Sequence, residues 1–170
     1  MSNSIIKIQP IDFASVLKIA DAQLGKSYIT RKDLVRFSEL DQILLLKQDA
    51  TIAGFITWEV QFPKNTMSII NKKDKDQIFI KSIVTHSTFQ KQGIGSQLVS
   101  HIIQKYNEHH IALLGWKANG HCNIEKLCLS LGFSCTGEMK DIWKKECDSG
   151  AFDCPEYDCE CRCSALVFEK

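Results

Sequence analysis

Residues 78–95 read IFIKSIVTHSTFQKQGIG and carry the strongest structural signal in the chain. The first part, 78–84, is rich in β-branched and aromatic side chains and predicts a strand. From Gly95 onward, apolar side chains recur on one helical face: Leu98, Val99, Ile102, Ile103 and Tyr106. Glycines let backbone N–H groups turn inward, and a helix N-terminus carries partial positive charge. The loop at 90–95, Gln-Lys-Gln-Gly-Ile-Gly, therefore predicts a pyrophosphate site.

Two common phosphate loops do not fit this stretch. The lysine of a GxxxxGK[ST] loop is missing, and so is the GxGxxG spacing of dinucleotide-binding proteins. The loop therefore predicts a phosphate ligand of another kind.

The patterns on either side predict a mixed sheet with helices on its faces. Upstream we expect a strand at 5–8, one helix at 10–25 and a second from 30 onward. An antiparallel hairpin follows, with strands at 43–47 and 52–60. Downstream we expect a strand at 111–116, a helix at 124–131 and two strands at 135–139 and 164–169. This order predicts an α/β fold in one domain, 1–170, with a central mixed sheet.

Composition bounds the class of protein. The chain has 170 residues, with 21 Lys and Arg against 20 Asp and Glu, so no global field attracts nucleic acid or anionic lipid. We therefore predict neither a nucleic-acid nor a membrane partner. The N-terminus lacks the basic leader and apolar run of a signal peptide, and no segment approaches about 20 apolar residues. These features favour the cytoplasm.

A cysteine-rich segment, about 147–163, holds five of the eight cysteines. In a reducing compartment such clustering favours a metal over disulfides. Dense thiolates suit tetrahedral, structural zinc, and the candidate ligands are Cys154, Cys159, Cys161 and Cys163. A redox-active or disulfide-forming loop and unligated thiols are the alternatives. Hydrolytic zinc chemistry is disfavoured because there is no HExxH pattern.

The 90–95 loop resembles that of the GNAT acetyltransferase family. The family's motif is Gln or Arg, two residues, Gly, one residue, then Gly or Ala, between the fourth strand and the third helix. Gln90, Gly93 and Gly95 match this motif. The element order extends the resemblance over most of the chain, and its specific motifs lie within 80–133. It implies a GNAT-like acyl-CoA N-acyltransferase fold and acetyl-CoA as cosubstrate.

The resemblance also implies where acetyl-CoA binds. In the family, backbone groups at the end of the preceding strand pair with the pantetheine arm, and these map onto Ile83, Val84 and Thr85. The amides expected to cradle the pyrophosphate belong to Lys91, Gln92, Gly93, Ile94, Gly95 and Ser96. An asparagine that contacts the CoA arm in the family falls at His121, and Asn119 and Asn123 lie two residues to either side. Any of the three can take that role.

An acetyl thioester is already activated, so direct attack needs an aligned amine, a stabilised oxyanion and a proton for the departing thiolate. By resemblance, an N–H near Val84 or Thr85 polarises the carbonyl. The family's acid is a tyrosine in the helix before a Leu-Gly-Phe sequence, and that position is Cys128 here. A thiol with a pKa of about 8.5 can protonate a CoA thiolate. The alternative is that Cys128 is a core residue.

Three further residues are candidates for proton transfer or acceptor binding. Glu59 in the predicted hairpin and His86 after the 78–84 strand can each act as a base through water. Tyr28, in the loop where the family's acceptor site begins, can line the pocket or serve as an alternative acid.

The sequence therefore predicts an N-acetyltransferase. It moves an acetyl group from acetyl-CoA to a primary amine of a small molecule or a protein, and it acts as a monomer or homodimer. A non-catalytic acyl-CoA-binding or sensing module is one alternative, because the family's tyrosine is missing. A zinc-stabilised interaction domain on a GNAT scaffold is another, because of the cysteine-rich segment.

Overall fold

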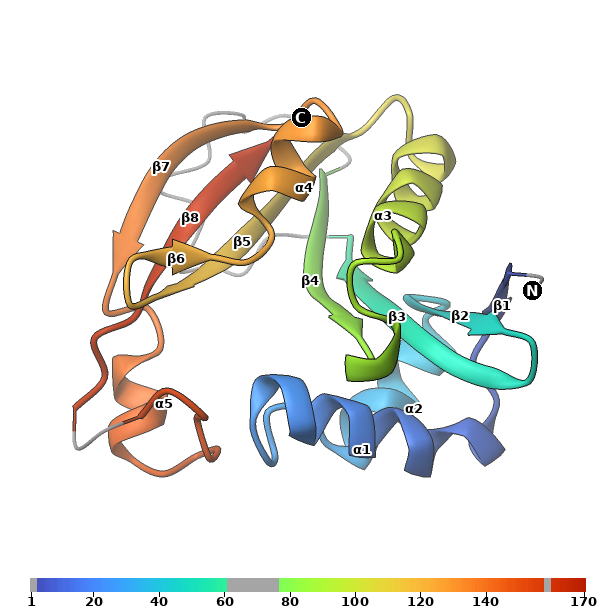
Figure 1. The fold of residues 1–170 in the computed structure, drawn as a ribbon, viewed down its shortest axis with the longest axis horizontal. Helices are drawn as coiled ribbons and strands as arrows, with labels where there is room; N and C mark the ends of the chain where they lie inside the picture. The colour runs from blue at the N-terminus through green and yellow to red at the C-terminus, as the bar shows by residue number, and fades with distance from the viewer. Residues whose placement is uncertain (1–2, 61–76, 158–159) are drawn as a thin grey trace.

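The computed structural model describes residues 3–60, 77–157 and 160–170 (Figure 1). Within them, eight strands form one sheet in the order β1-β2-β3-β4-β5-β8-β7, and β6 pairs with β5. The strands are β1 Asn3–Lys7, β2 Ile43–Gln48, β3 Thr51–Glu59, β4 Gln77–Thr85, β5 His110–Ala118, β6 His121–Cys122, β7 Ser134–Lys140 and β8 Ser164–Glu169. Among these strands β4 and β5 alone are parallel. The predicted mixed α/β sheet is confirmed.

Helices cover both faces of this sheet. They are α1 Phe13–Leu24, α2 Arg31–Glu39, α3 Ile94–Lys105, α4 Glu125–Ser130 and α5 Lys144–Asp148, with short 3-10 turns η1 Pro10–Asp12 and η2 Ser87–Phe89. One core joins α1 and α2 to Leu45 and Phe55, and another joins α3 and α4 to Leu46 and Ile56. Because neighbouring strand residues point to opposite faces, the two helix pairs lie on opposite sides of the sheet. In the described part of the chain, no helix is long and apolar enough to span a membrane.

Local signals fix several helix ends where they were predicted. The Thr30 hydroxyl accepts from the Asp33 N–H at 3.3 Å, and the Asp33 carboxylate accepts from the Thr30 N–H at 2.9 Å. This capping box starts α2. Gly25, with φ +101°, ends α1. The two-residue β6 and five-residue α5 were not predicted, because such short elements show no hydrophobic period.

Halfway along β4, its pairing with β3 contains a β-bulge. Thr57 of β3 lies opposite Ser82 while Trp58 lies opposite Ile80, so Lys81 is the extra residue of the bulge. The pairing of β4 with β5 runs from Gln77 to Ile80 and stops there. A bulge bends a strand and increases its twist. The two parallel strands therefore diverge beyond Ile80, as Figure 1 shows.

Candidate active site

Beyond Ile80, β5 no longer pairs with β4, so the last residues of β4 present backbone groups on the side where β5 would otherwise lie. The N–H of His86 donates to the carbonyl of Ala53 in β3 at 2.9 Å, so His86 faces β3. Successive residues of an antiparallel strand point their backbone groups alternately toward the partner and away. Val84 therefore also faces β3, whereas Ile83 and Thr85 turn their N–H and C=O groups to the opposite side. We call the backbone of residues 83–85 the open edge.

The 90–95 loop leads from this strand into the N-terminus of α3. Lys91 and Gly93 have left-handed φ values of +61° and +78°, which turn the chain sharply. Gly93 is the N-cap of α3, and no side chain caps the helix there. The first amides of a helix have no intrahelical partner, so those at 94–96 are available to an anion. Apart from its chain neighbours, a Cβ at Gly93 would meet one atom of the described residues, Gln97 Nε2 at 3.9 Å, so the space beside it is open.

The loop and the open edge meet at Gly95. A Cβ built there would lie 3.0 Å from Leu127 Cδ1, 3.7 Å from Ile83 Cγ2 and 3.9 Å from Thr85 Oγ1. Gln90 anchors the loop from the other side, because its Nε2 donates to Gln23 Oε1 of α1 at 2.8 Å. The arrangement offers a strand-like partner for an extended chain and an anion site at the end of that chain.

The other residues predicted to contact CoA lie between β5 and α4. His121 and Asn123 are exposed. Asn119 turns away, since its Nδ2 donates to Glu156 Oε2 at 2.9 Å. His121 and Asn123 thus have solvent-facing side chains on the connection to α4, and their contact with CoA stays a prediction.

Cys128 is fully buried in the core between the sheet and α4. Burial raises the pKa of its thiol to about 12, which makes it a weaker acid than an ordinary thiol. An acid this weak is poorly matched to a CoA thiolate. Its position fits the alternative of a core residue beside Leu127.

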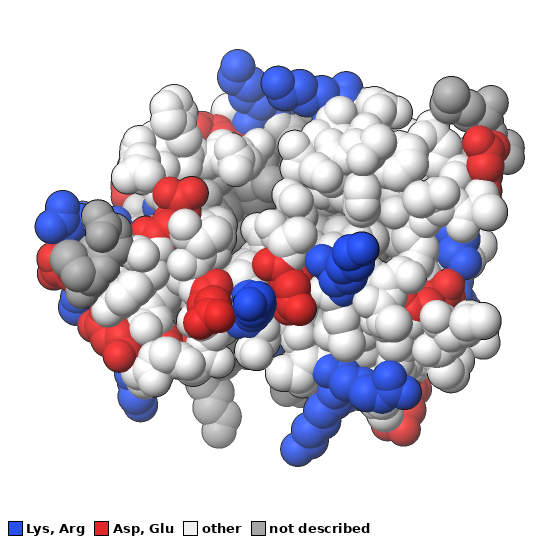
Figure 2. Space-filling view, turned by 60° about the horizontal axis from the view of Figure 1, so that its bottom comes forward, with Lys and Arg blue, Asp and Glu red and all other residues white. Residues whose placement is uncertain are grey.

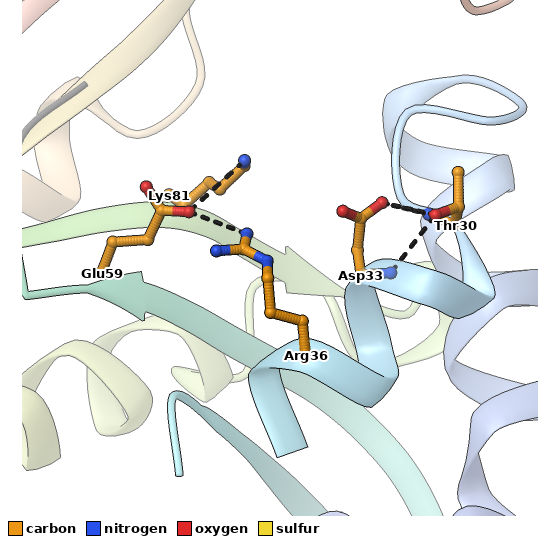
Figure 3. A network of polar contacts seen from close by, with 5 residues as sticks. All are labelled: Thr30, Asp33, Arg36, Glu59 and Lys81. Carbon is orange, nitrogen blue, oxygen red and sulfur yellow. Dashed lines mark hydrogen bonds and ion pairs between the residues drawn. The ribbon is translucent and has the colours of Figure 1, made fainter. Parts of the chain in front are cut away.

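Glu59 belongs to a charged network between α2 and the sheet (Figure 3). Its Oε1 accepts from Arg36 Nη2 at 2.9 Å and lies 3.7 Å from Lys81 Nζ. In the strand register Glu59 lies opposite Phe79, four residues before Ile83. At about 3.3 Å per residue this is about 13 Å along the strand, so a proton leaving an amine at the open edge must travel through water to reach Glu59.

His86 already uses its ring in a local contact. Its Nδ1 accepts from the Thr88 N–H at 3.3 Å and so caps η2. The imidazole is held beside the ring of Phe89, with 5.8 Å between ring centroids. While Nδ1 accepts this bond, the proton of the neutral ring lies on Nε2, so His86 can act as a base only by giving up this contact.

Tyr28 lies in the loop between α1 and α2, under the connection between β7 and β8 (residues 141–163). Its ring meets Phe152 edge-on at 5.2 Å, and the Trp143 side chain hydrogen-bonds its hydroxyl. Burial raises the pKa of Tyr28, an effect that exceeds the opposing hydrogen bond, so the hydroxyl stays protonated. Tyr28 also packs against the core that contains Val84.

The β7–β8 connection contacts the α1–α2 loop through the backbone as well. The Asp153 N–H donates to the Lys26 carbonyl at 3.0 Å. A Cβ at Gly25 would lie 2.1 Å from the Asp153 carbonyl oxygen, so only glycine fits this approach. The connection thus borders the candidate site on the side of α1 and α2.

The predicted metal ligands do not form a finished metal site. Among residues 3–60, 77–157 and 160–170, no group of three or more His, Cys, Asp or Glu is arranged to hold a metal ion. Cys159 lies outside the described residues. Cys154, Cys161 and Cys163 do share one cluster, and Cys147 joins them there.

Several site features were missed from the sequence. A bulge carries no pattern of its own, so the sequence places Lys81 within a regular strand. The contact of Gln90 with α1 is a tertiary pairing that spacing does not encode. Trp143 and Phe152 could have been found from the sequence, since aromatic side chains in a polar, cysteine-rich stretch suggest a buried contact.

The open edge ends at the uncapped N-terminus of α3, an arrangement that suits an extended ligand with an anionic end. The sequence matches the Acetyltransferase (GNAT) family over residues 13–127, and the chain belongs to this family. No curated protein sequence matches it.

Solved structures show the same fold. An N-acetyltransferase from Staphylococcus aureus Mu50 superposes with a TM-score of 0.71 at 15% identity, covering 100% of this chain and 98% of the other. The structure of yncA from Salmonella typhimurium, with its cofactor acetyl-CoA, gives 0.70 at 14% identity, covering 100% and 94%. Arabidopsis thaliana NAA60, in complex with a bisubstrate analogue, gives 0.72 at 11% identity, covering 99% and 97%. The fold is therefore the GNAT acyl-CoA N-acyltransferase fold.

Proposed function

We propose that this protein transfers the acetyl group of acetyl-CoA to a primary amine. The observation that carries the proposal is the open edge of β4, which continues into the uncapped N-terminus of α3 at Gly95. This geometry fits a pantetheine arm followed by a pyrophosphate. Family membership and the acetyl-CoA in the related yncA structure support the same cosubstrate.

In the proposed reaction the amine attacks the thioester directly. The pyrophosphate rests on the amides of residues 93–96, and the open edge pairs with the pantetheine arm. The N–H groups of Ile83 and Thr85, which face away from β3, are the donors available to the developing oxyanion. The C–N bond forms, the C–S bond breaks, the amine loses a proton and the departing thiolate gains one. No covalent enzyme intermediate is needed.

The acceptor is proposed to enter from the side of α1, α2 and the β7–β8 connection. Tyr28, Trp143 and Phe152 supply aromatic walls there. On the face that carries α1 and this connection, acidic and basic side chains are interspersed (Figure 2). No single sign of charge dominates this view, so recognition depends on local contacts. Relatives include an enzyme for an alanine of ribosomal protein S18, so both protein and small-molecule amines belong in a substrate screen.

Of the three predicted catalytic residues, we favour Tyr28 as the proton donor to the thiolate. Its side chain lies beside Phe152 and Trp143 on the proposed acceptor side, whereas Cys128 is enclosed in the core and Glu59 is engaged by Arg36. Tyr28→Phe is expected to lower kcat about a hundredfold while acetyl-CoA affinity stays within about threefold, because general acid catalysis contributes 10²–10⁴-fold. Cys128→Ala is the matched comparison and should lower stability while kcat stays within about threefold. The opposite pattern in steady-state kinetics would assign the acid to Cys128.

A non-catalytic acyl-CoA sensor is the second candidate, favoured by Cys128 at the position of the family's tyrosine. Release of the CoA thiol with a broad panel of primary amines and peptides with free N-termini separates the two. We expect thiol release with at least one member, dependent on both substrates. Tight acetyl-CoA binding without release from any member would favour the sensor.

A further inference from the structure

We propose that the β7–β8 connection binds one zinc ion through Cys147, Cys154, Cys161 and Cys163. The proposal is independent of acetyl transfer. It rests on how these thiols pack, on their contacts with one another and on the irregular backbone that carries them.

The four cysteines gather at the centre of the connection although they lie up to 16 positions apart in the sequence. Cys147, Cys161 and Cys163 have exposed fractions of 6%, 4% and 7%, and Cys154 packs against them. Trp116, Trp143 and Phe152 enclose the cluster. Thiols scattered by chance in a surface loop would not converge on one enclosed point.

The connection has little else to hold it. Among its described residues α5 is five residues long and no strand is present, and a bridge between Lys26 and Asp153 joins the connection to the α1–α2 loop. A small core without secondary structure is commonly completed by a metal or by cross-links. A buried cluster of thiols at this point fits a metal, and the same thiols are free in the structure.

The thiols are close neighbours. Cys161 and Cys154 lie near enough to interact with the thiol of Cys147, and the same two residues interact with that of Cys163. Tetrahedral zinc with Zn–S bonds of about 2.3 Å places its sulfurs about 3.8 Å apart. The four sulfurs are not yet arranged as a ligand set among the described residues. Binding of zinc would draw the four sulfurs together around the ion, and Cys154 is the one ligand of the four that is partly exposed.

Binding exchanges protons for the metal. One Zn²⁺ replaces four thiol protons and gives a tetrathiolate with two negative charges, and nothing is oxidised or reduced. The Trp116 side chain hydrogen-bonds to the sulfur of Cys163. An indole N–H is only a donor, so this contact suits a metal-bound thiolate and orients it.

The ligand set differs from the one predicted from sequence by one residue. Cys147 enters it, since the end of α5 brings this thiol to Cys161. Cys159 lies outside the described residues. A zinc ion at this point would fix Phe152 and Asp153 against the α1–α2 loop, and so hold the wall beside Tyr28.

Elemental analysis of the natural chain, purified without chelator, tests the proposal. We expect about one zinc per chain, falling at least fivefold in Cys147→Ser and Cys161→Ser. Cys135→Ser is the matched control, because that thiol is exposed and outside the cluster, and it should keep its zinc. Cys159→Ser should keep it too. Loss of zinc in Cys159→Ser with retention in Cys147→Ser would overturn the ligand set.

A second measurement needs no variant, so it still tests the proposal if the cysteine variants fail to fold. The natural chain is stripped with a chelator and titrated with Co²⁺, which reports tetrahedral thiolate ligands through charge-transfer and ligand-field absorption. We expect saturation at about one Co²⁺ per chain and displacement by Zn²⁺. Absence of zinc from the purified chain together with no cobalt spectrum would refute the site, as would a disulfide among these cysteines in the freshly purified protein.

Discussion

Thr85→Pro is expected to leave the protein folded and to lower kcat/KM for acetyl transfer by about 10³. Proline removes the backbone N–H, and the N–H of Thr85 faces the side that β5 has left. Loss of a single oxyanion donor lowers the rate by about 10²–10³, and loss of a pantetheine contact adds to this. A strand edge tolerates proline where its N–H points away from the partner.

Two variants make this prediction specific. Thr85→Val removes the hydroxyl and keeps the N–H, so it should retain activity within about tenfold. Val84→Pro removes an N–H that faces β3, and Val84 is buried, so this variant should be strongly destabilised. Kinetics and urea unfolding of the three proteins provide the test. Equal activity of Thr85→Pro and Thr85→Val would show that the open edge takes no part in the reaction.

Gly54→Ala is expected to lower the free energy of unfolding by about 3 kcal/mol or more. A Cβ at Gly54 would lie 2.5 Å from the carbonyl oxygen of Val84 and 2.9 Å from Ile94 Cγ2. The first of these atoms belongs to the backbone, so it cannot move aside without disturbing the pairing of β3 with β4. Overpacking of a close-packed core costs about 1–3 kcal/mol, and a backbone clash lies at the upper end.

Gly120→Ala is the control for this prediction. Beyond its chain neighbours, no described residue has an atom within 4 Å of the Cβ position at Gly120, and the cost there is limited to its left-handed φ of +80°, about 1–2 kcal/mol. Urea unfolding compares the two. A loss in Gly54→Ala no larger than in Gly120→Ala would contradict the close approach of β3, β4 and α3 that positions the 90–95 loop.

The sequence was most informative where local chemistry alone fixes the backbone. The capping box at Thr30 and Asp33, the glycine that ends α1, and the strand, loop and helix around 90–95 all depend on neighbours in the chain. The hairpin of β2 and β3 was equally clear, because its apolar runs flank a short turn. These elements sufficed for the mixed sheet and for the family.

The sequence was least informative where distant segments meet. The direction of the Ile83 and Thr85 amides follows from register, which a run of apolar residues does not specify. The bulge at Lys81, where β4 pairs with β3, likewise arises from pairing. Cys128 illustrates the same limit, since counting from a motif assigned its position but its burial comes from packing.

Thermal unfolding with and without acetyl-CoA, for the natural chain and Gly93→Glu, tests the central claim most directly. A ligand that binds only the folded state stabilises it by about 2.7 kcal/mol at a hundredfold excess over Kd. We predict that acetyl-CoA raises the melting temperature of the natural chain and leaves that of Gly93→Glu unchanged. The carboxylate of Gly93→Glu would occupy the open space at the N-cap of α3. Gly93→Asn tolerates the left-handed φ without the charge and should keep most of the shift. No shift in the natural chain at saturating acetyl-CoA, or an equal shift in Gly93→Glu, would contradict the account.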